Sequence, residues 1–158
     1  MPGKQAKILT ADQIDDLLFF AETTRHPLRN RVIVLLSIKA GLRAAEIANL
    51  TWDMLLDPSG GVGSSLELRD CAAKMGSGRA IPLHHDLRLA LSILRQSSSG
   101  MGPIVRSVRD GPMIPLSIVI WFNRVTLQRD CIHPVKTAGY LGLQSFLCSR
   151  WMEQSVRS

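Results

Sequence analysis

An apolar helical stretch that ends at a glycine constrains the fold of this chain most. The residues before Gly41 have helical spacing, and a second, shorter helix is expected to begin just after Arg43. Gly41 suits the left-handed conformation that ends a helix. Leu42, Ile47 and Leu50 can pack inward, which would hold Arg43 at a rigid corner between two helices. A guanidinium fixed there offers a planar fork of donors that matches a phosphate or a carboxylate.

Glu46 follows Arg43 by about one helical turn and leaves two interpretations open. In the first, Arg43 is held at the corner and its guanidinium binds a phosphate or a carboxylate. In the second, Arg43 and Glu46 form an ordinary ion pair on the surface of a helical corner, with no further function.

Composition and charge are those of a basic globular domain. The chain has 158 residues, enough for one domain with a core, and 46% of them are hydrophobic and 20% charged. The net charge is +6 and the isoelectric point is about 9.8, which favours polyanionic partners. Charge of this size does not by itself establish nucleic-acid binding, because many basic proteins bind none.

The sequence predicts neither a membrane segment nor a metal or cofactor site. No apolar run is long enough to span a membrane, and residues 1–9 form a short basic arm without the apolar segment of a signal peptide. Cys71, Cys131 and Cys148 are odd in number and lack metal-ligand spacing. We interpret them as reduced thiols of a cytoplasmic protein.

The expected fold class is α+β and mainly helical, with helices around a small β-hairpin. Thr10 and Gln13 have the spacing of a capping box, and Pro27 suits the first turn of a second helix. Helices are expected over residues 11–23, 27–39, a short stretch after Arg43, about 87–96 and 115–129. Strands are expected over residues 66–69 and 80–83, and residues 103–113 favour irregular structure.

Two buried helix faces follow from the apolar spacing. The second helix is expected to bury Leu28, Val32, Leu35 and Leu36. The last helix is expected to bury Ile118, Trp121, Phe122 and Val125, with Leu116, Ile120 and Leu127 nearly completing an apolar circle.

The hairpin supplies a second group of basic residues. Lys74 lies at its glycine-rich turn, and Arg79 comes shortly before Ile81-Pro82-Leu83. Together with Ala40-Gly41-Leu42-Arg43, Glu46, Leu50 and Trp52, this order resembles the tyrosine recombinase (phage integrase) family. That family carries a (Thr/Ala)-Gly-Leu-Arg-x-x-Glu box, and then a hairpin lysine followed by an Arg-x-(Ile/Val)-Pro-Leu segment.

The resemblance implies site-specific recombination or integration of DNA, as carried out by mobile genetic elements. In the family a tyrosine attacks a phosphodiester and forms a phosphotyrosine, without metal or other cofactor. Arg43 would stabilise charge on the phosphate, Lys74 would act as general acid to the leaving oxygen, and Arg79 would be a further DNA contact. The implied partners are double-stranded DNA and further copies of the chain assembled on it.

The second half of the family pattern is less complete. The family places a His-x-x-Arg box, a Gly-His pair and the nucleophilic tyrosine near its C-terminus. His133 is the candidate histidine, but Lys136 stands where the arginine is expected. We interpret Tyr140, which follows His133 closely, as a packing or surface residue. His85-Asp86-Leu87-Arg88 has the letters of the box, but its position indicates the start of a helix.

The resemblance covers about residues 8–127. We therefore expect a partial recombinase-like catalytic domain over residues 10–127 and a divergent C-terminal tail over residues 128–158, without the family's separate N-terminal domain. On this evidence the chain is incomplete as a catalyst. Two alternatives stay open: a non-catalytic DNA-binding remnant of the family, and an unrelated small helical interaction domain.

Overall fold

The computed structural model describes residues 10–73 and 78–132, and it is mainly helical with a small antiparallel hairpin, as the sequence predicts. The elements follow the expected order along the chain. They are α1 (Ala11–Glu22), α2 (Pro27–Lys39), α3 (Ala44–Ala48), the 3-10 helix η1 (Trp52–Met54), β1 (Ser65–Leu68), β2 (Arg79–Pro82), α4 (His85–Gln96) and α5 (Pro115–Ile132).

Helix α1 begins with the predicted capping box. The Gln13 peptide N–H donates to the Thr10 hydroxyl at 3.3 Å, and the Thr10 peptide N–H donates to the Gln13 side-chain oxygen at 3.0 Å. Two donors that the first turn would leave without partners are thereby satisfied. The helix packs inward through Leu17 and Ala21, which are both buried.

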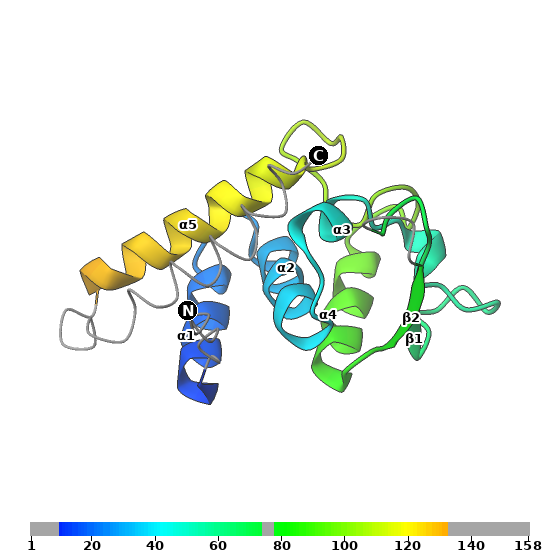
Figure 1. Cartoon of the computed structure of the whole chain (residues 1–158), viewed down its shortest axis with the longest axis horizontal. Helices are drawn as coiled ribbons and strands as arrows, with labels where there is room; N and C mark the ends of the chain where they lie inside the picture. The colour runs from blue at the N-terminus through cyan, green and yellow to red at the C-terminus, as the bar shows by residue number, and fades with distance from the viewer. Residues whose placement is uncertain (1–9, 74–77, 133–158) are drawn as a thin grey trace, which may run out of the picture.

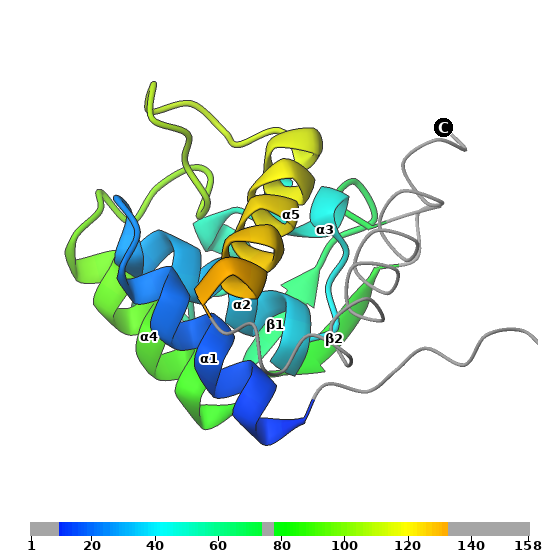
Figure 2. The same cartoon turned by 90° about the vertical axis from the view of Figure 1, so that its left-hand side faces the viewer.

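Helix α2 is the centre of the molecule. It contacts α1, α3 and α4, while α5 crosses against α1 and α3 (Figures 1 and 2). Five consecutive residues, Val32 to Leu36, are fully buried, so the middle of α2 is covered on all sides rather than along one stripe. The prediction of a buried Leu28 is wrong, because this side chain is 38% exposed. Leu28 lies in the first turn, whereas the buried part of α2 begins at Asn30.

The hairpin lies beside α4 at the opposite end from α1 (Figure 1). Its strands pair in antiparallel register from Ser65 opposite Pro82 to Leu68 opposite Arg79. Strand β1 buries Leu66 and Leu68, whereas β2 is largely exposed. Pro82 ends the strand, as expected for a residue that cannot donate to a ladder.

Helix α5 follows a looped segment and extends a little further than predicted. Residues 97–114 contain no helix, and isolated bridges join Arg106 to Pro112 and Thr51 to Pro103. Of the expected α5 face, Ile118, Phe122 and Val125 are buried and Trp121 is partly buried; Val119 is buried as well. Leu116 and Ile120 face outward. None of the helices in the described ranges has the length and apolarity that crossing a membrane requires.

Candidate functional site

The corner between α2 and α3 fixes the backbone of Arg43. Gly41 has a φ of +64°, in the left-handed region, and the Leu42 N–H donates to the Leu36 carbonyl at 3.2 Å. Arg43 caps the start of α3 in an extended conformation. Leu42, with Ile47 and Leu50 further on, is buried, as the sequence predicts. The side chain of Arg43 leaves this anchored backbone and is 40% exposed.

Glu46 is part of the packed corner and does not lie on the surface. Its side chain is 1% exposed, and its Oε2 accepts a hydrogen bond from the Arg43 peptide N–H at 2.9 Å. The alternative of an exposed Arg43–Glu46 pair is therefore wrong in its placement of the carboxylate. Buried carboxylates need a charged or hydrogen-bonding partner, because leaving water is costly for an ionised group.

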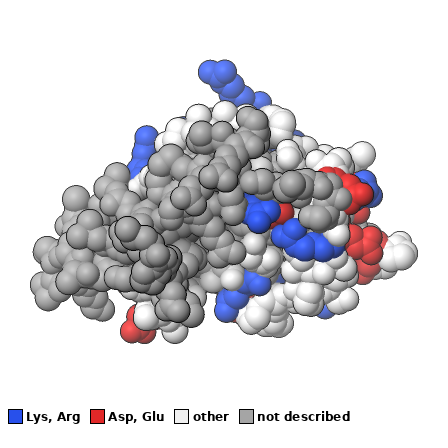
Figure 3. All heavy atoms as spheres, in the orientation of Figure 1, with Lys and Arg blue, Asp and Glu red and all other residues white. Residues whose placement is uncertain are grey.

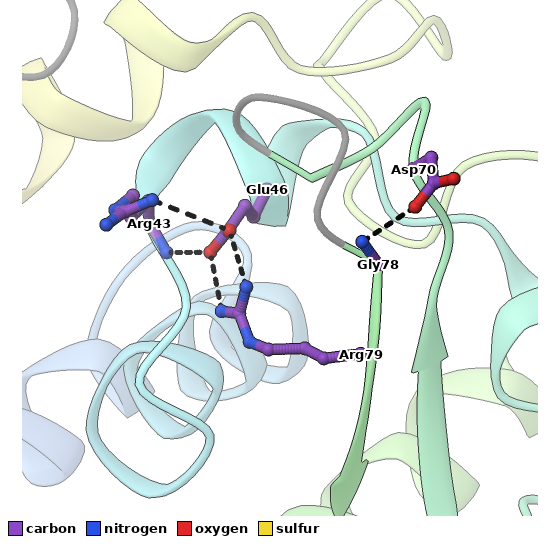
Figure 4. Close-up of polar contacts among 5 residues, drawn as sticks. All are labelled: Arg43, Glu46, Asp70, Gly78 and Arg79. Atoms are coloured by element: carbon purple, nitrogen blue, oxygen red, sulfur yellow. Dashed lines mark hydrogen bonds and ion pairs between the residues drawn. The ribbon is translucent and has the colours of Figure 1, made fainter.

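The partner of Glu46 comes from the hairpin (Figure 4). Arg79, the first residue of β2, donates from Nη1 to Oε1 at 3.1 Å and from Nη2 to Oε2 at 3.2 Å. This is a bidentate arginine–carboxylate ion pair, which is both strong and geometrically specific. It joins two segments that lie 33 residues apart in the sequence. Sequence reasoning selected Arg79 as a DNA contact and did not find this pairing.

The electrostatics of the corner favour an ionised Glu46, with Arg43 at the outer limit of an ion pair. Burial raises the pKa of Glu46, but the Arg79 hydrogen bonds, the Arg43 peptide hydrogen bond and the two positive charges outweigh it and lower the pKa overall. The closest approach of the Arg43 guanidinium to the carboxylate is 4.0 Å, from Nη1 to Oε1. In the described part of the chain, no hydrogen bond from that guanidinium is present. Arg43 thus keeps its donors for another acceptor.

Gly78 is a closely packed glycine of the hairpin and directly precedes Arg79 in the sequence. The Gly78 N–H donates to the Asp70 carboxylate at 2.7 Å (Figure 4).

In Figure 3, basic side chains gather over α3 and the adjoining part of the hairpin, with acidic side chains beside them. Lys74, His133 and Tyr140 lie outside the described residues, so their predicted roles stay predictions.

The His85-Asp86-Leu87-Arg88 segment has the structural role that its position indicated. Helix α4 begins at His85, and the Asp86 N–H donates to Nδ1 of His84 at 3.3 Å. Arg88 donates from Nε to the Val62 carbonyl at 3.1 Å and so ties α4 to the loop before β1. Within the described ranges, no group of three or more His, Cys, Asp or Glu residues is placed to hold a metal ion.

Comparison with protein families identifies the chain. The model of the phage integrase family matches residues 7–103, which is more than half of the sequence. This chain belongs to the phage integrase family. The matched range contains the Arg43 corner, Glu46, the hairpin and all of α4, so the features that define the site lie within the family domain. No curated protein sequence matches the chain significantly.

Solved structures of recombinases and integrases share the fold of this integrase-family chain. XerA recombinase is 20% identical with a TM-score of 0.60, over 79% of this chain and 43% of that one. A lambda integrase tetramer bound to a Holliday junction is 24% identical with a TM-score of 0.58, over 75% and 34%. The Tn1549 transposon integrase with circular intermediate DNA is 20% identical with a TM-score of 0.59, over 94% and 53%. The chain thus spans about a third to a half of the length of these proteins.

Proposed function

We propose that this chain binds double-stranded DNA through the backbone phosphates, as part of a site-specific recombination or integration protein of the tyrosine recombinase type. The proposal rests on the Arg43 guanidinium. The backbone of Arg43 is anchored at a rigid corner, and the guanidinium donates no hydrogen bond to any of the described residues. A planar fork of this kind matches two oxygens of a phosphate. The net charge of +6 supports attraction to DNA.

The chemical role of Arg43 follows from its charge. In a phosphoryl transfer, negative charge builds up on the non-bridging oxygens, and a preorganised guanidinium stabilises it. Lys74 as general acid and His133 as the catalytic histidine remain proposals from the family resemblance. The resemblance also implied that Arg79 contacts DNA, but its pairing with Glu46 supports a different role. Strand cleavage also needs a nucleophilic tyrosine, and we interpret Tyr140, which follows His133 closely, as a packing or surface residue. We therefore propose DNA binding, and no complete strand transfer, for this chain by itself.

The proposed partners agree with what the similar structures contain. The lambda integrase structures are described as a tetramer on a Holliday junction and a dimer on a core site, and the transposon integrase is described as a DNA complex. By this analogy, we propose that several copies of the chain, or of the protein to which it belongs, assemble on DNA.

Replacing Arg43 by glutamine tests the proposal. A hydrogen bond to a charged group contributes about 1.5 to 3 kcal/mol, so affinity for a short DNA duplex should fall by about 10- to 100-fold. The dependence of log affinity on log salt should become shallower by about one unit, because one phosphate contact is lost. Both quantities can be measured by fluorescence anisotropy in a salt titration.

Arg109→Gln is the charge-matched control. Arg109 is exposed in the loop before α5, and its replacement removes the same charge from a different element. We expect this variant to bind nearly as the unmodified chain does. If Arg43→Gln and Arg109→Gln weaken binding equally, DNA attraction is a matter of net charge, and Arg43 is not a specific phosphate contact.

A further inference from the structure

Two guanidinium groups share one buried carboxylate at the Arg43 corner, and they share it unequally. Arg79 takes both oxygens of Glu46, at 3.1 and 3.2 Å, whereas the Arg43 guanidinium stands 4.0 Å from the nearer one. Both arginine side chains are equally exposed, at 40%. The difference is therefore one of pairing and not of burial.

A carboxylate and a phosphate compete for the same arginine fork, since both present two oxygens in a similar plane. Glu46 cannot swing out of reach of Arg43, because the Arg43 peptide N–H holds Oε2 at 2.9 Å and the side chain is buried. If both carboxylate oxygens lost their present partner, the Arg43 guanidinium would be the remaining ion-pair partner among the described residues. A movement of about 1 Å would close the remaining gap to the usual 2.7–2.9 Å of a charged hydrogen bond.

We propose that Arg79 is a positioning residue, which saturates Glu46 and so keeps the guanidinium of Arg43 available to a DNA phosphate. The inference rests on the proposed role of Arg43 as a phosphate contact. It assigns Arg79 a different task from direct DNA contact, because both of its terminal nitrogens donate to Glu46. It also assigns Glu46 two effects. Glu46 holds the backbone of the corner through the Arg43 peptide N–H, and its carboxylate competes with a DNA phosphate for the Arg43 guanidinium unless Arg79 is bound to it.

The test is a pair of substitutions and their combination in the full chain, with a short DNA duplex as the probe. Arg79→Met should weaken DNA binding by about tenfold, because the Arg43 guanidinium would then pair with Glu46 in place of a phosphate. The dependence of log affinity on log salt should become shallower by about one unit. Glu46→Gln removes the competing charge but keeps an acceptor for the Arg43 peptide N–H, and its affinity is the reference for the double variant. The double variant should recover most of the affinity that Arg79→Met loses, to within about threefold of Glu46→Gln.

The double variant separates positioning from direct contact. If Arg79 touched the phosphate itself, adding Glu46→Gln would restore nothing, and the double variant would bind as weakly as Arg79→Met; that result would overturn the inference. Recovery of both affinity and salt slope would support it. A role in folding alone would change thermal stability without this recovery.

Two further measurements keep the test decisive. If Arg79→Met does not fold, Arg79→Lys provides the second variant: its single ammonium covers the carboxylate incompletely, so we expect an intermediate affinity that Glu46→Gln again restores. Failure of Glu46→Gln to restore it would count against the inference. Arg43→Gln tests the underlying proposal separately: unchanged binding there would remove the proposed function itself, whereas weak binding without the Arg79 recovery would remove only the inference.

Discussion

Replacing Trp52 by alanine should lower the free energy of unfolding by about 3 to 5 kcal/mol, the usual cost of truncating a buried tryptophan. Trp52 is 1% exposed and lies between the Arg43 corner and the hairpin along the chain. Its peptide N–H donates to the Gly102 carbonyl at 3.0 Å, which joins the corner to the loop before α5. The alanine variant would leave a cavity beneath these segments. Urea unfolding followed by circular dichroism measures the loss.

Two controls show whether packing is the cause. Trp52→Phe should cost clearly less, because the ring is kept in part and the indole N–H has no hydrogen-bond partner among the described residues. Leu116→Ala removes an apolar side chain that is 62% exposed and should change stability by no more than about 0.5 kcal/mol. A Trp52→Ala loss as small as that of Leu116→Ala would show that Trp52 does not support the core.

Replacing Gly78 by alanine should destabilise the hairpin and also weaken DNA binding. A Cβ at Gly78 would lie 2.6 Å from an Asp70 carboxylate oxygen and 2.8 Å from the Leu68 carbonyl, and one of these is backbone of the paired strand. Such overpacking typically costs about 1 to 3 kcal/mol. The strand must then shift at the residue before Arg79, which would loosen the fork on Glu46. Thermal unfolding and duplex anisotropy measure the two effects.

Gly111→Ala is the matched control for this substitution. A Cβ at Gly111 meets nothing within 4 Å, so the same chemical change should leave stability and DNA affinity almost unaltered. If Gly78→Ala behaves like Gly111→Ala, the close approach at the hairpin has no energetic consequence. If Gly78→Ala loses stability but keeps its affinity, the hairpin does not act on the site through Arg79.

Local sequence signals predicted the helices because the forces that begin and end them are local. The Thr10 capping box, Pro27 at the start of α2 and Gly41 after its end each act within one helical turn, and all three are present. Burial was harder to predict where it depends on distant elements. Leu28 has the spacing of a buried residue, yet the elements that surround α2 do not cover its first turn.

The same distinction applies to the site. The Arg43 corner could be predicted, because Gly41, Leu42 and Ile47 define it within a few residues. The pairing of Glu46 with Arg79 could not, since nothing in the spacing of two residues on a helix and a strand says that their side chains meet. A basic residue in a hairpin therefore suggested a DNA contact, when its fork is in fact bound to a carboxylate.

A crystal structure of the chain with a DNA duplex tests the central claim most directly. The account predicts that the Arg43 guanidinium donates to the non-bridging oxygens of one backbone phosphate at about 2.7 to 2.9 Å. Arg79 should meanwhile stay paired with Glu46. A complex in which the duplex lies away from the Arg43 corner, or in which Arg79 leaves Glu46 to bind the phosphate, would contradict it.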